Sequence, residues 1–213
     1  MAGYLPLCAF RQGLLPTACR SCAWWQTTGN GHSTPEAAAA KRQQWMTTLE
    51  RNWGSTGLLV ENGGGSDPAI VASINFAPVA AVPRLHALSL GPFPPGSTLL
   101  FCLRLEEGQT QPQAKRLLHK ALRHLKDRDV EEVYAVASYS GGTQDGNSCE
   151  FFSVEFLSAN GFEQVMGNGR LHLMRVDLRG LLSLIEQLEA TVRRVLRIEP
   201  TPSPAAWTRR ETP

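Results

Sequence analysis

Long apolar runs and a strong net charge are both missing from this sequence. No hydrophobic stretch approaches the ~20 residues that a membrane-spanning helix requires. Residues 1–8 lack the charged start and the extended apolar core of a secretion signal. Lysine and arginine number 21 against 19 acidic residues, and the net charge of +2 gives too weak a field to favour nucleic acid or a membrane surface. We therefore expect a soluble cytoplasmic protein whose partner is a small molecule or another protein.

Cysteine is also scarce. Five cysteines, an odd number spread over 213 residues, do not form the framework of a disulfide-stapled secreted domain, so reduced thiols are expected. Cys19 and Cys22 have the spacing of half a zinc site or of a redox pair. A structural zinc needs four ligands and the sequence holds no second Cys-x-x-Cys, so no metal is expected. Buried thiols are the simpler interpretation, and a thiol or metal protein built on this pair is the least favoured function.

A phosphate-binding P-loop is absent as well. Residues 62–68 are rich in glycine but lack the Gly-Lys-Ser/Thr of that motif. They separate two β-rich segments, 57–60 and 69–76, which predicts a β-hairpin. A second hairpin is predicted around Gly167-Asn168-Gly169, between residues 162–166 and 170–178.

The first half of the chain otherwise predicts one strand and one long helix. Residues 1–17 are interrupted by glycine and proline and are expected to be irregular, whereas 18–27 are expected to form a strand around two tryptophans. Ser33 and Glu36 have capping-box spacing, which predicts a helix over 35–53. Residues 77–97 are rich in proline and are expected to form a long irregular loop.

The central unit is strand, turn, helix and strand. Residues 99–105 form an apolar run, residues 111–125 carry an amphipathic helical pattern, and 132–137 form the next strand. The helix would present the unpaired amides and the positive dipole of its first turn at the end of the strand, an arrangement that favours a phosphate. The exposed face of this helix is expected to carry four positive charges, which either suit a phosphate or are simply solvated. These are the charges of Lys115, Arg116, Lys120 and Arg123.

Helices are also predicted towards the C-terminus. A short helix over 149–159 ends at Asn160-Gly161, which fits a left-handed C-cap. An amphipathic helix over 179–198 would cover the sheet or pair with a second copy of the chain. Residues 199–213, with four prolines, are expected to be a disordered tail.

Two motifs in this order resemble the GNAT N-acetyltransferases. Residues 109–114 fit the family's Gln/Arg-x-x-Gly-x-Gly/Ala turn with Pro112 at the first glycine position, and residues 156–162 are similar to its Phe-Tyr-x-x-x-Gly-Phe segment. The early Cys19-x-x-Cys22-x-x-Trp25 is similar to that of uncharacterised actinobacterial members. The order of elements over residues 18–178 also matches, so the resemblance implies a GNAT-like domain there.

The resemblance implies a mixed α/β fold. Its central sheet is mostly antiparallel, with a splayed pair of parallel strands, 99–105 and 132–137, flanked by helices. Acetyl-CoA or another acyl-CoA would bind between those strands, with its pantetheine along the first strand and its pyrophosphate on amides of the turn. The residues implied at the acyl-CoA are Leu103, Arg104, Leu105, Gln109, Thr110, Gln111, Gln113, Ala114, Lys115 and Arg116.

The catalytic groups are less well defined. Glu106 and Glu107, at the end of the strand, are candidates for the base that deprotonates an amine. The family commonly has a tyrosine at the position of Leu157, so the general acid is missing there, and Tyr139 is a nearby substitute, with Tyr134 and Cys149 as weaker ones. His86 is a further candidate base.

The sequence thus favours an acyl-CoA-dependent N-acyltransferase that acts on an amine by direct attack in a ternary complex. Pro112, which cannot donate an amide hydrogen, and Leu157 favour the alternative of a degenerate member that binds CoA or a protein without catalysis. A homodimer is a further expectation.

Overall fold

The structure, a computed structural model, describes residues 3–29, 34–62, 69–106, 108, 110–139 and 151–180. Within these residues one eight-stranded sheet has the order β1-β2-β3-β4-β5-β8-β7, and β6 pairs with β5 off this path. The strands are β1 (Gly3–Pro6), β2 (Gly57–Glu61), β3 (Ile70–Pro78), β4 (Thr98–Leu105), β5 (Glu132–Ser138), β6 (Phe152–Ser153), β7 (Glu163–Gly167) and β8 (His172–Asp177). The pairs are antiparallel except β4 with β5 and the short pairing of β5 with β6, which confirms the expected mixed α/β class with a mostly antiparallel sheet.

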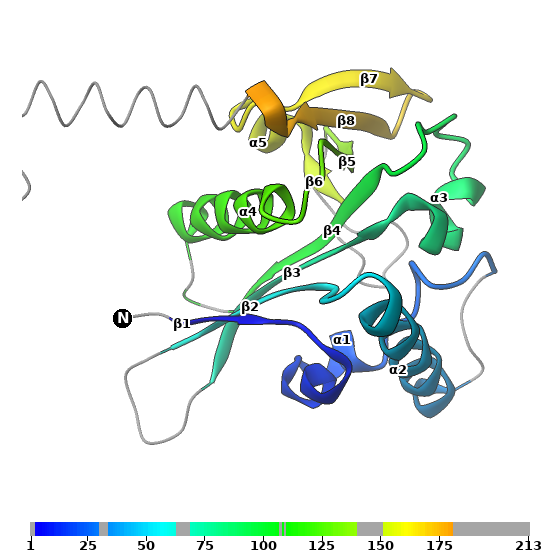
Figure 1. Cartoon of the computed structure of the whole chain (residues 1–213), viewed down its shortest axis with the longest axis vertical. Helices are drawn as coiled ribbons and strands as arrows, with labels where there is room; N and C mark the ends of the chain where they lie inside the picture. The colour runs from blue at the N-terminus through cyan, green and yellow to red at the C-terminus, as the bar shows by residue number, and fades with distance from the viewer. Residues whose placement is uncertain are drawn as a thin grey trace, which may run out of the picture.

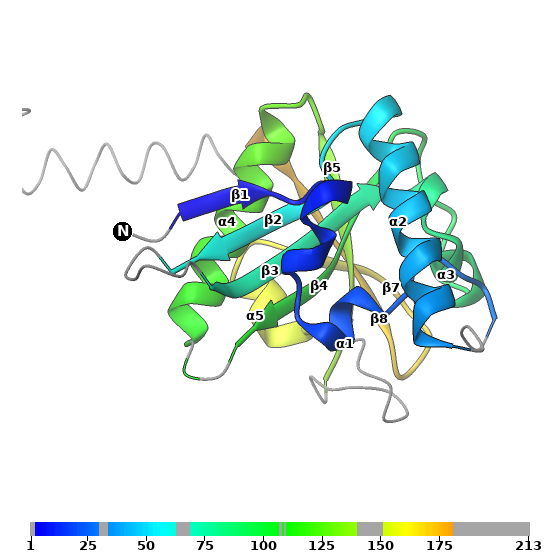
Figure 2. The ribbon, with the colours of Figure 1, turned by 90° about the horizontal axis from the view of Figure 1, so that it is seen from below.

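Helices cover both faces of the sheet (Figure 1). The helix α4 (Gln111–Lys126) lies on one face together with α5 (Val154–Ser158). The helix α2 (Pro35–Asn52) and the shorter elements η1 (Ala9–Leu14) and α1 (Thr17–Arg20) lie on the other face, as Figure 2 shows from below. This second face also carries η2 (Val79–Ala81) and α3 (Pro83–Ala87).

The helix α4 shows why the central unit folds as predicted. Its apolar residues recur every three or four positions, so they form one stripe that packs against the sheet. The members of that stripe, all at most 1% exposed, are Leu117, Leu118, Ala121, Leu122 and Leu125. The charged residues of the opposite face are exposed, as expected.

The strand expected over 18–27 is wrong. This segment contains α1, and its following residues close local turns such as the hydrogen bond from the Gln26 amide to the Ala23 carbonyl (3.1 Å). Trp25 is 3% exposed and packs at 4.8 Å against Trp24, so these side chains enter the core from a loop. The first strand is β1 instead, in a segment expected to be irregular, because pairing with β2 supplies its hydrogen bonds.

The long helix is confirmed as α2, but its N-cap is different. The Thr34 side chain accepts a hydrogen bond from the Ala37 amide (3.2 Å), whereas Ser33 lies outside the described residues. The loop over 77–97 is more regular than expected. Pro83 begins α3, and buried residues such as Leu85 anchor the segment to the core.

Both hairpins are confirmed, as β2–β3 and β7–β8. The helix expected over 149–159 is shorter: it is α5, and residues 152–153 pair with β5 as strand β6 instead. Gly161 has a φ of +86°, as a left-handed cap requires. Residues 140–150 and 181–213 lie outside the described part, and with them the predicted C-terminal helix and tail. No helix in the described part is long and apolar enough to cross a membrane.

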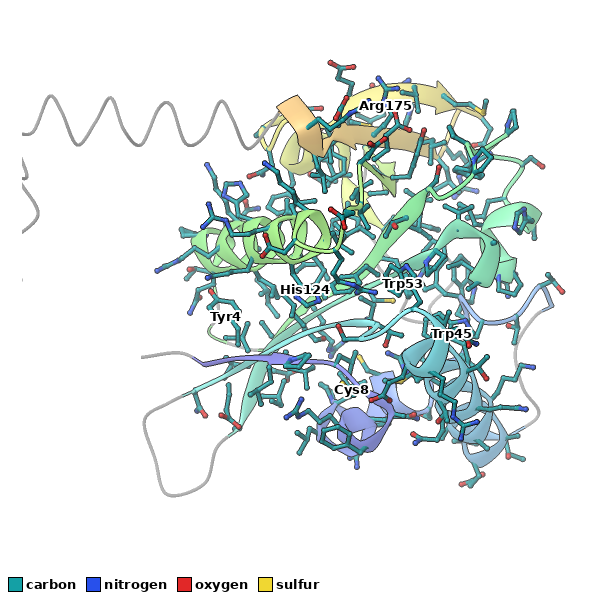
Figure 3. All side chains as sticks on the ribbon, viewed as in Figure 1. Tyr4, Cys8, Trp45, Trp53, His124 and Arg175 are labelled. Atoms are coloured by element: carbon teal, nitrogen blue, oxygen red, sulfur yellow. The ribbon has the colours of Figure 1, made fainter. Side chains whose placement is uncertain are left out.

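His124 makes stability depend on pH. It contacts Phe76 (5.6 Å between ring centroids) and the Ser55 hydroxyl (3.1 Å), near Trp53 beneath α4 (Figure 3). Burial, and then the charge of Arg128, lower the pKa of His124 below its usual 6.5, although Asp127 opposes this. The unfolded chain therefore binds more protons below pH 6.5, and stability falls as the pH falls through that value.

Urea denaturation between pH 7.5 and 5 measures this dependence. We expect His124→Gln to lose less stability than the wild type on acidification. The exposed His86 supplies the matched control, since His86→Gln should follow the wild type. Identical pH profiles for wild type and His124→Gln would contradict the assignment.

Candidate functional site

The parallel strands β4 and β5 separate part-way along their length. They pair at Thr98–Val133, Leu99–Tyr134 and Leu100–Ala135, and the pairing ends there. The burial of β4 changes at nearly the same place. Its residues are buried up to Phe101 and half-buried from Cys102 to Leu105. The second half of β4 therefore has an edge that β5 does not cover.

The far edge of this divergence is formed by β5 and β6. β8 occupies one edge of β5 from Glu132 to Ala137, so β4 and β6 share the other edge. β6 joins it at Ala137–Phe152 and Ser138–Ser153, beyond the last contact with β4. The strands β4 and β5 are thus not paired along their whole length, and β6 takes the edge of β5 that β4 leaves free.

A β-bulge lies in β4 where the divergence begins. Asn75 of β3 is opposite Phe101, but Ser73 is opposite Arg104, so β4 has one more residue than β3 between these pairs. Cys102 lies in the bulge with a φ of +52°, which is unusual for a residue other than glycine. A bulge leaves one residue out of the ladder and turns its peptide groups. The sequence carries no glycine here, so nothing in it indicated the bulge.

The first turn of α4 follows directly on β4 and the loop after it. The Gln113 side chain accepts hydrogen bonds from the Thr110 amide (2.6 Å) and the Thr110 hydroxyl (3.0 Å), closing a capping box. The amides of Gln113 and Ala114 both donate to the Thr110 carbonyl (2.9 and 3.2 Å). Pro112 has no amide hydrogen, and a helix provides no acceptor for its first amide, so Gln111 is the donor that the helix leaves available in this turn.

Side-chain charges lie close to this helix start. Lys115 and Arg116 are exposed on the first two turns of α4, and Lys120 follows on the same side. Arg104 forms an ion pair with Glu106 (3.4 Å) at the end of β4. The α4 dipole and these cations make the region attractive to an anion, with Glu106 as the opposing charge.

Of the three predicted catalytic residues, the structure describes Glu106 and Tyr139. Glu106 lies at the end of β4, where its amide donates to the Val71 carbonyl (2.9 Å) and its carboxylate is paired with Arg104. Glu107 lies outside the described residues, as does Gln109 of the predicted binding turn. Tyr139 follows β5, is 64% exposed, and packs its ring on His172 at 4.6 Å.

Other candidates fit less well. Tyr134 lies at the paired end of β5. Its hydroxyl donates a hydrogen bond to the Glu132 carboxylate (3.0 Å), and burial raises the pKa of Tyr134.

His86 lines a cavity of about 710 Å³ formed by residues 78–80, 86 and 89–97. That cavity reaches Ser97 at the start of β4, roughly 16 Å along the strand from Cys102, so it does not adjoin the divergence. Leu157 is fully buried in the core between α5 and the sheet.

Sequence reasoning missed two further groups at the end of β5. The Ser138 hydroxyl and both ring nitrogens of His172 are buried without a hydrogen-bond partner in the described residues. Neither belongs to a motif, and only strand pairing brings them to the divergence. No cluster of metal ligands occurs within the described part of the chain.

No protein-family model matches this sequence, and no curated protein matches it significantly. An N-acetyltransferase from Staphylococcus aureus Mu50 has a TM-score of 0.51 at 14% identity, covering 84% of this chain and 99% of that chain. The ribosomal-protein-alanine N-acetyltransferase from Brucella melitensis has a TM-score of 0.50 at 14% identity, covering 82% and 99%.

A third similar structure is yncA from Salmonella typhimurium, described as an acetyltransferase and solved with its cofactor acetyl-CoA. It has a TM-score of 0.51 at 10% identity, covering 83% of this chain and 94% of that chain. Taken with the strand order and the divergence of β4 from β5, these likenesses show that the chain shares the fold of these acetyltransferases, which is the mixed α/β fold that the GNAT resemblance implied.

Proposed function

We propose that this protein is an acyl-CoA-dependent N-acyltransferase, with acetyl-CoA as the expected donor. The observation that carries the proposal is the end of the β4–β5 pairing after Leu100 and Ala135. The edge from Cys102 to Leu105 offers backbone groups that the two amides of a pantetheine arm can pair with, as an added strand would. A solved relative of the same fold holds acetyl-CoA, which supports the donor class.

The phosphates of the donor would lie at the start of α4. The Gln111 amide, the helix dipole and the side chains of Lys115 and Arg116 supply the attraction there. Thr110, Gln113 and Ala114 shape this turn, although their own hydrogen bonds limit how many amides face a ligand. Leu103 and Leu105 would contact the arm from β4.

The reaction is attack of an amine nitrogen on the thioester carbonyl. A carbon–nitrogen bond forms, the carbon–sulfur bond breaks, and CoA leaves as a thiolate. Backbone amides at the Cys102 bulge would stabilise the oxyanion. Glu106, or Glu107, would take the proton of the amine, and Tyr139 would return a proton to the thiolate. Positioning of the two substrates supplies most of the acceleration in this proposal.

Thermal melting with acetyl-CoA tests donor binding. A ligand at ~100 times its dissociation constant stabilises the protein by ~2.7 kcal/mol, which corresponds to a rise in Tm of roughly 5–10 °C for a chain of this size. Release of CoA thiol in the presence of a panel of amines then tests transfer. Absence of a shift with acetyl-, propionyl- and longer acyl-CoA would contradict the proposal.

The second candidate is a protein that binds CoA without catalysis. Leu157 favours it, because this residue is fully buried where the family commonly has a tyrosine, so α5 presents no acid at that position. A rise in Tm with both CoA and acetyl-CoA, but no CoA release with any amine, would support this candidate over the enzyme.

Three expectations from the sequence remain part of the proposal. The amine acceptor is the second substrate, the protein acts in the cytoplasm, and it pairs with a second copy of itself. Light scattering of the full chain measures the last of these, and a monomeric mass would contradict it.

A further inference from the structure

Cys19 and Cys22 lie near the bulged half of β4. Cys22 packs against the same core cluster as Cys102, and Trp24 and Trp45 also pack against this cluster. Cys19 is close enough to both other thiols that their charges would raise its pKa. All three side chains are half-buried thiols, so three sulfurs gather on the α2 face of the sheet.

The backbone between Cys19 and Cys22 forms a turn that is compatible with a disulfide. The Cys22 amide donates a hydrogen bond to the Cys19 carbonyl (3.3 Å), which closes a turn of four residues. Such a turn brings its end Cα atoms to within about 7 Å. Disulfides join Cα atoms about 4.4–6.8 Å apart, so the ends of this turn lie in the range that a disulfide can span.

Two buried side chains hold this turn in place. Gln12, 5% exposed, donates to the carbonyls of Arg20 (3.2 Å) and Ala39 (3.1 Å). Arg42, 3% exposed, donates to the Cys22 carbonyl (3.3 Å) and to the Asn75 amide oxygen (3.1 Å). The turn is therefore fixed to α2 on one side and to β3 on the other.

The pair rests in its reduced form as half-buried thiols. Burial is the main cause that raises the pKa of Cys19, and the charge of Arg104 opposes it, so Cys19 is a thiol at neutral pH. Both residues are half-buried rather than fully buried, which leaves a path for a small oxidant.

We propose that Cys19 and Cys22 form a reversible dithiol–disulfide couple, oxidised by a low-molecular-mass disulfide. One thiolate attacks the external disulfide, forming a mixed disulfide and releasing one external thiol. The second thiolate attacks the protein sulfur of that bond, which forms the Cys19–Cys22 bond and releases the second external thiol. Two protein thiols are oxidised by two electrons in all, and the external disulfide takes up both electrons and both protons.

Tryptic digestion can identify the bond directly. The five cysteines fall on five separate peptides, residues 1–11, 12–20, 21–41, 85–104 and 129–170, because Arg20 stands between Cys19 and Cys22. The full chain is equilibrated with mixtures of reduced and oxidised glutathione, blocked with N-ethylmaleimide, digested and analysed by mass spectrometry without reductant.

We expect peptide 12–20 to be linked to peptide 21–41. The ratio of linked to unlinked peptides should fall about tenfold for each tenfold rise in the squared thiol concentration divided by the disulfide concentration. Linkage of 12–20 to 85–104 instead would show that Cys19 pairs with Cys102 and overturn the proposal. No linkage at any mixture would also overturn it.

Tryptophan emission provides a second measurement. Trp24 and Trp25 lie two and three residues after Cys22, so oxidation should change their emission in the wild type and in Cys8→Ser, the matched control. Cys22→Ser should show no such change, and a change of equal size in this variant would contradict the assignment. The peptide linkage is measured on the wild type, so it does not depend on how the variants fold.

Discussion

Replacing Phe101 by alanine is expected to lower the free energy of unfolding by about 3–5 kcal/mol. The side chain is 1% exposed and lies in β4 immediately before the bulge. Its ring centroid is 5.3 Å from that of Trp25 and 6.4 Å from that of Trp45, so truncation leaves a cavity between the sheet, α2 and the loop that carries Trp25. Urea denaturation followed by circular dichroism measures the loss.

Phe10 provides the control for this substitution. It is 73% exposed on η1, where its ring lies under the Arg11 guanidinium at 4.6 Å. Phe10→Ala is the same chemical change at the surface, and surface changes are usually within about 0.5 kcal/mol. A loss below about 1 kcal/mol for Phe101→Ala, or equal losses for the two variants, would refute the packing described for the α2 face.

The largest expected effect on ligand binding is that of Gln113→Glu. Glutamate can accept the same hydrogen bonds from Thr110, and a carboxylate in the first turn suits the helix dipole, so Tm should be unchanged or raised. The added negative charge would lie beside the phosphates of a bound acyl-CoA. Repulsion of about 1–2 kcal/mol corresponds to acetyl-CoA binding that is ~5–30-fold weaker.

Isothermal titration measures this change, with Gln164→Glu as the control. Gln164 is exposed on β7, away from α4, and the same change of charge there should alter the dissociation constant by less than about twofold. Equal affinity of Gln113→Glu and wild type would indicate that the phosphates do not lie at the start of α4. Weak binding by both variants would indicate a general effect of net charge.

Patterns among neighbouring residues correctly predicted those helices and hairpins that are specified by residues close together in the sequence. The apolar stripe of α4 and the glycine-containing turn of the β7–β8 hairpin each specify one element, and both are confirmed. Residues 18–27 show the limit of this reasoning. The apolar side chains of this segment suit a strand. The segment forms turns instead, because the first strand, β1, already occupies the neighbouring edge of β2.

The same limit applies to the candidate site. Pro112 and the residues around it indicated a helix start after β4, and the structure has it there. The sequence could not show that the Gln113 and Ala114 amides are engaged by Thr110, because this depends on how the turn closes. It also gave no sign that Cys102 lies in a bulge, since bulges follow from the register of paired strands.

The sequence by itself determined α2, α4 and the two hairpins, because the periodicity and the turn residues that specify them lie among neighbouring residues. Only the tertiary structure decided that β4 and β5 part after three pairs, that Cys102 takes a positive φ, and that Cys19 and Cys22 lie against β4. Each of these depends on contacts between segments far apart in the chain. Strand register and the packing of loops are set by the whole sheet and core, so no local pattern encodes them.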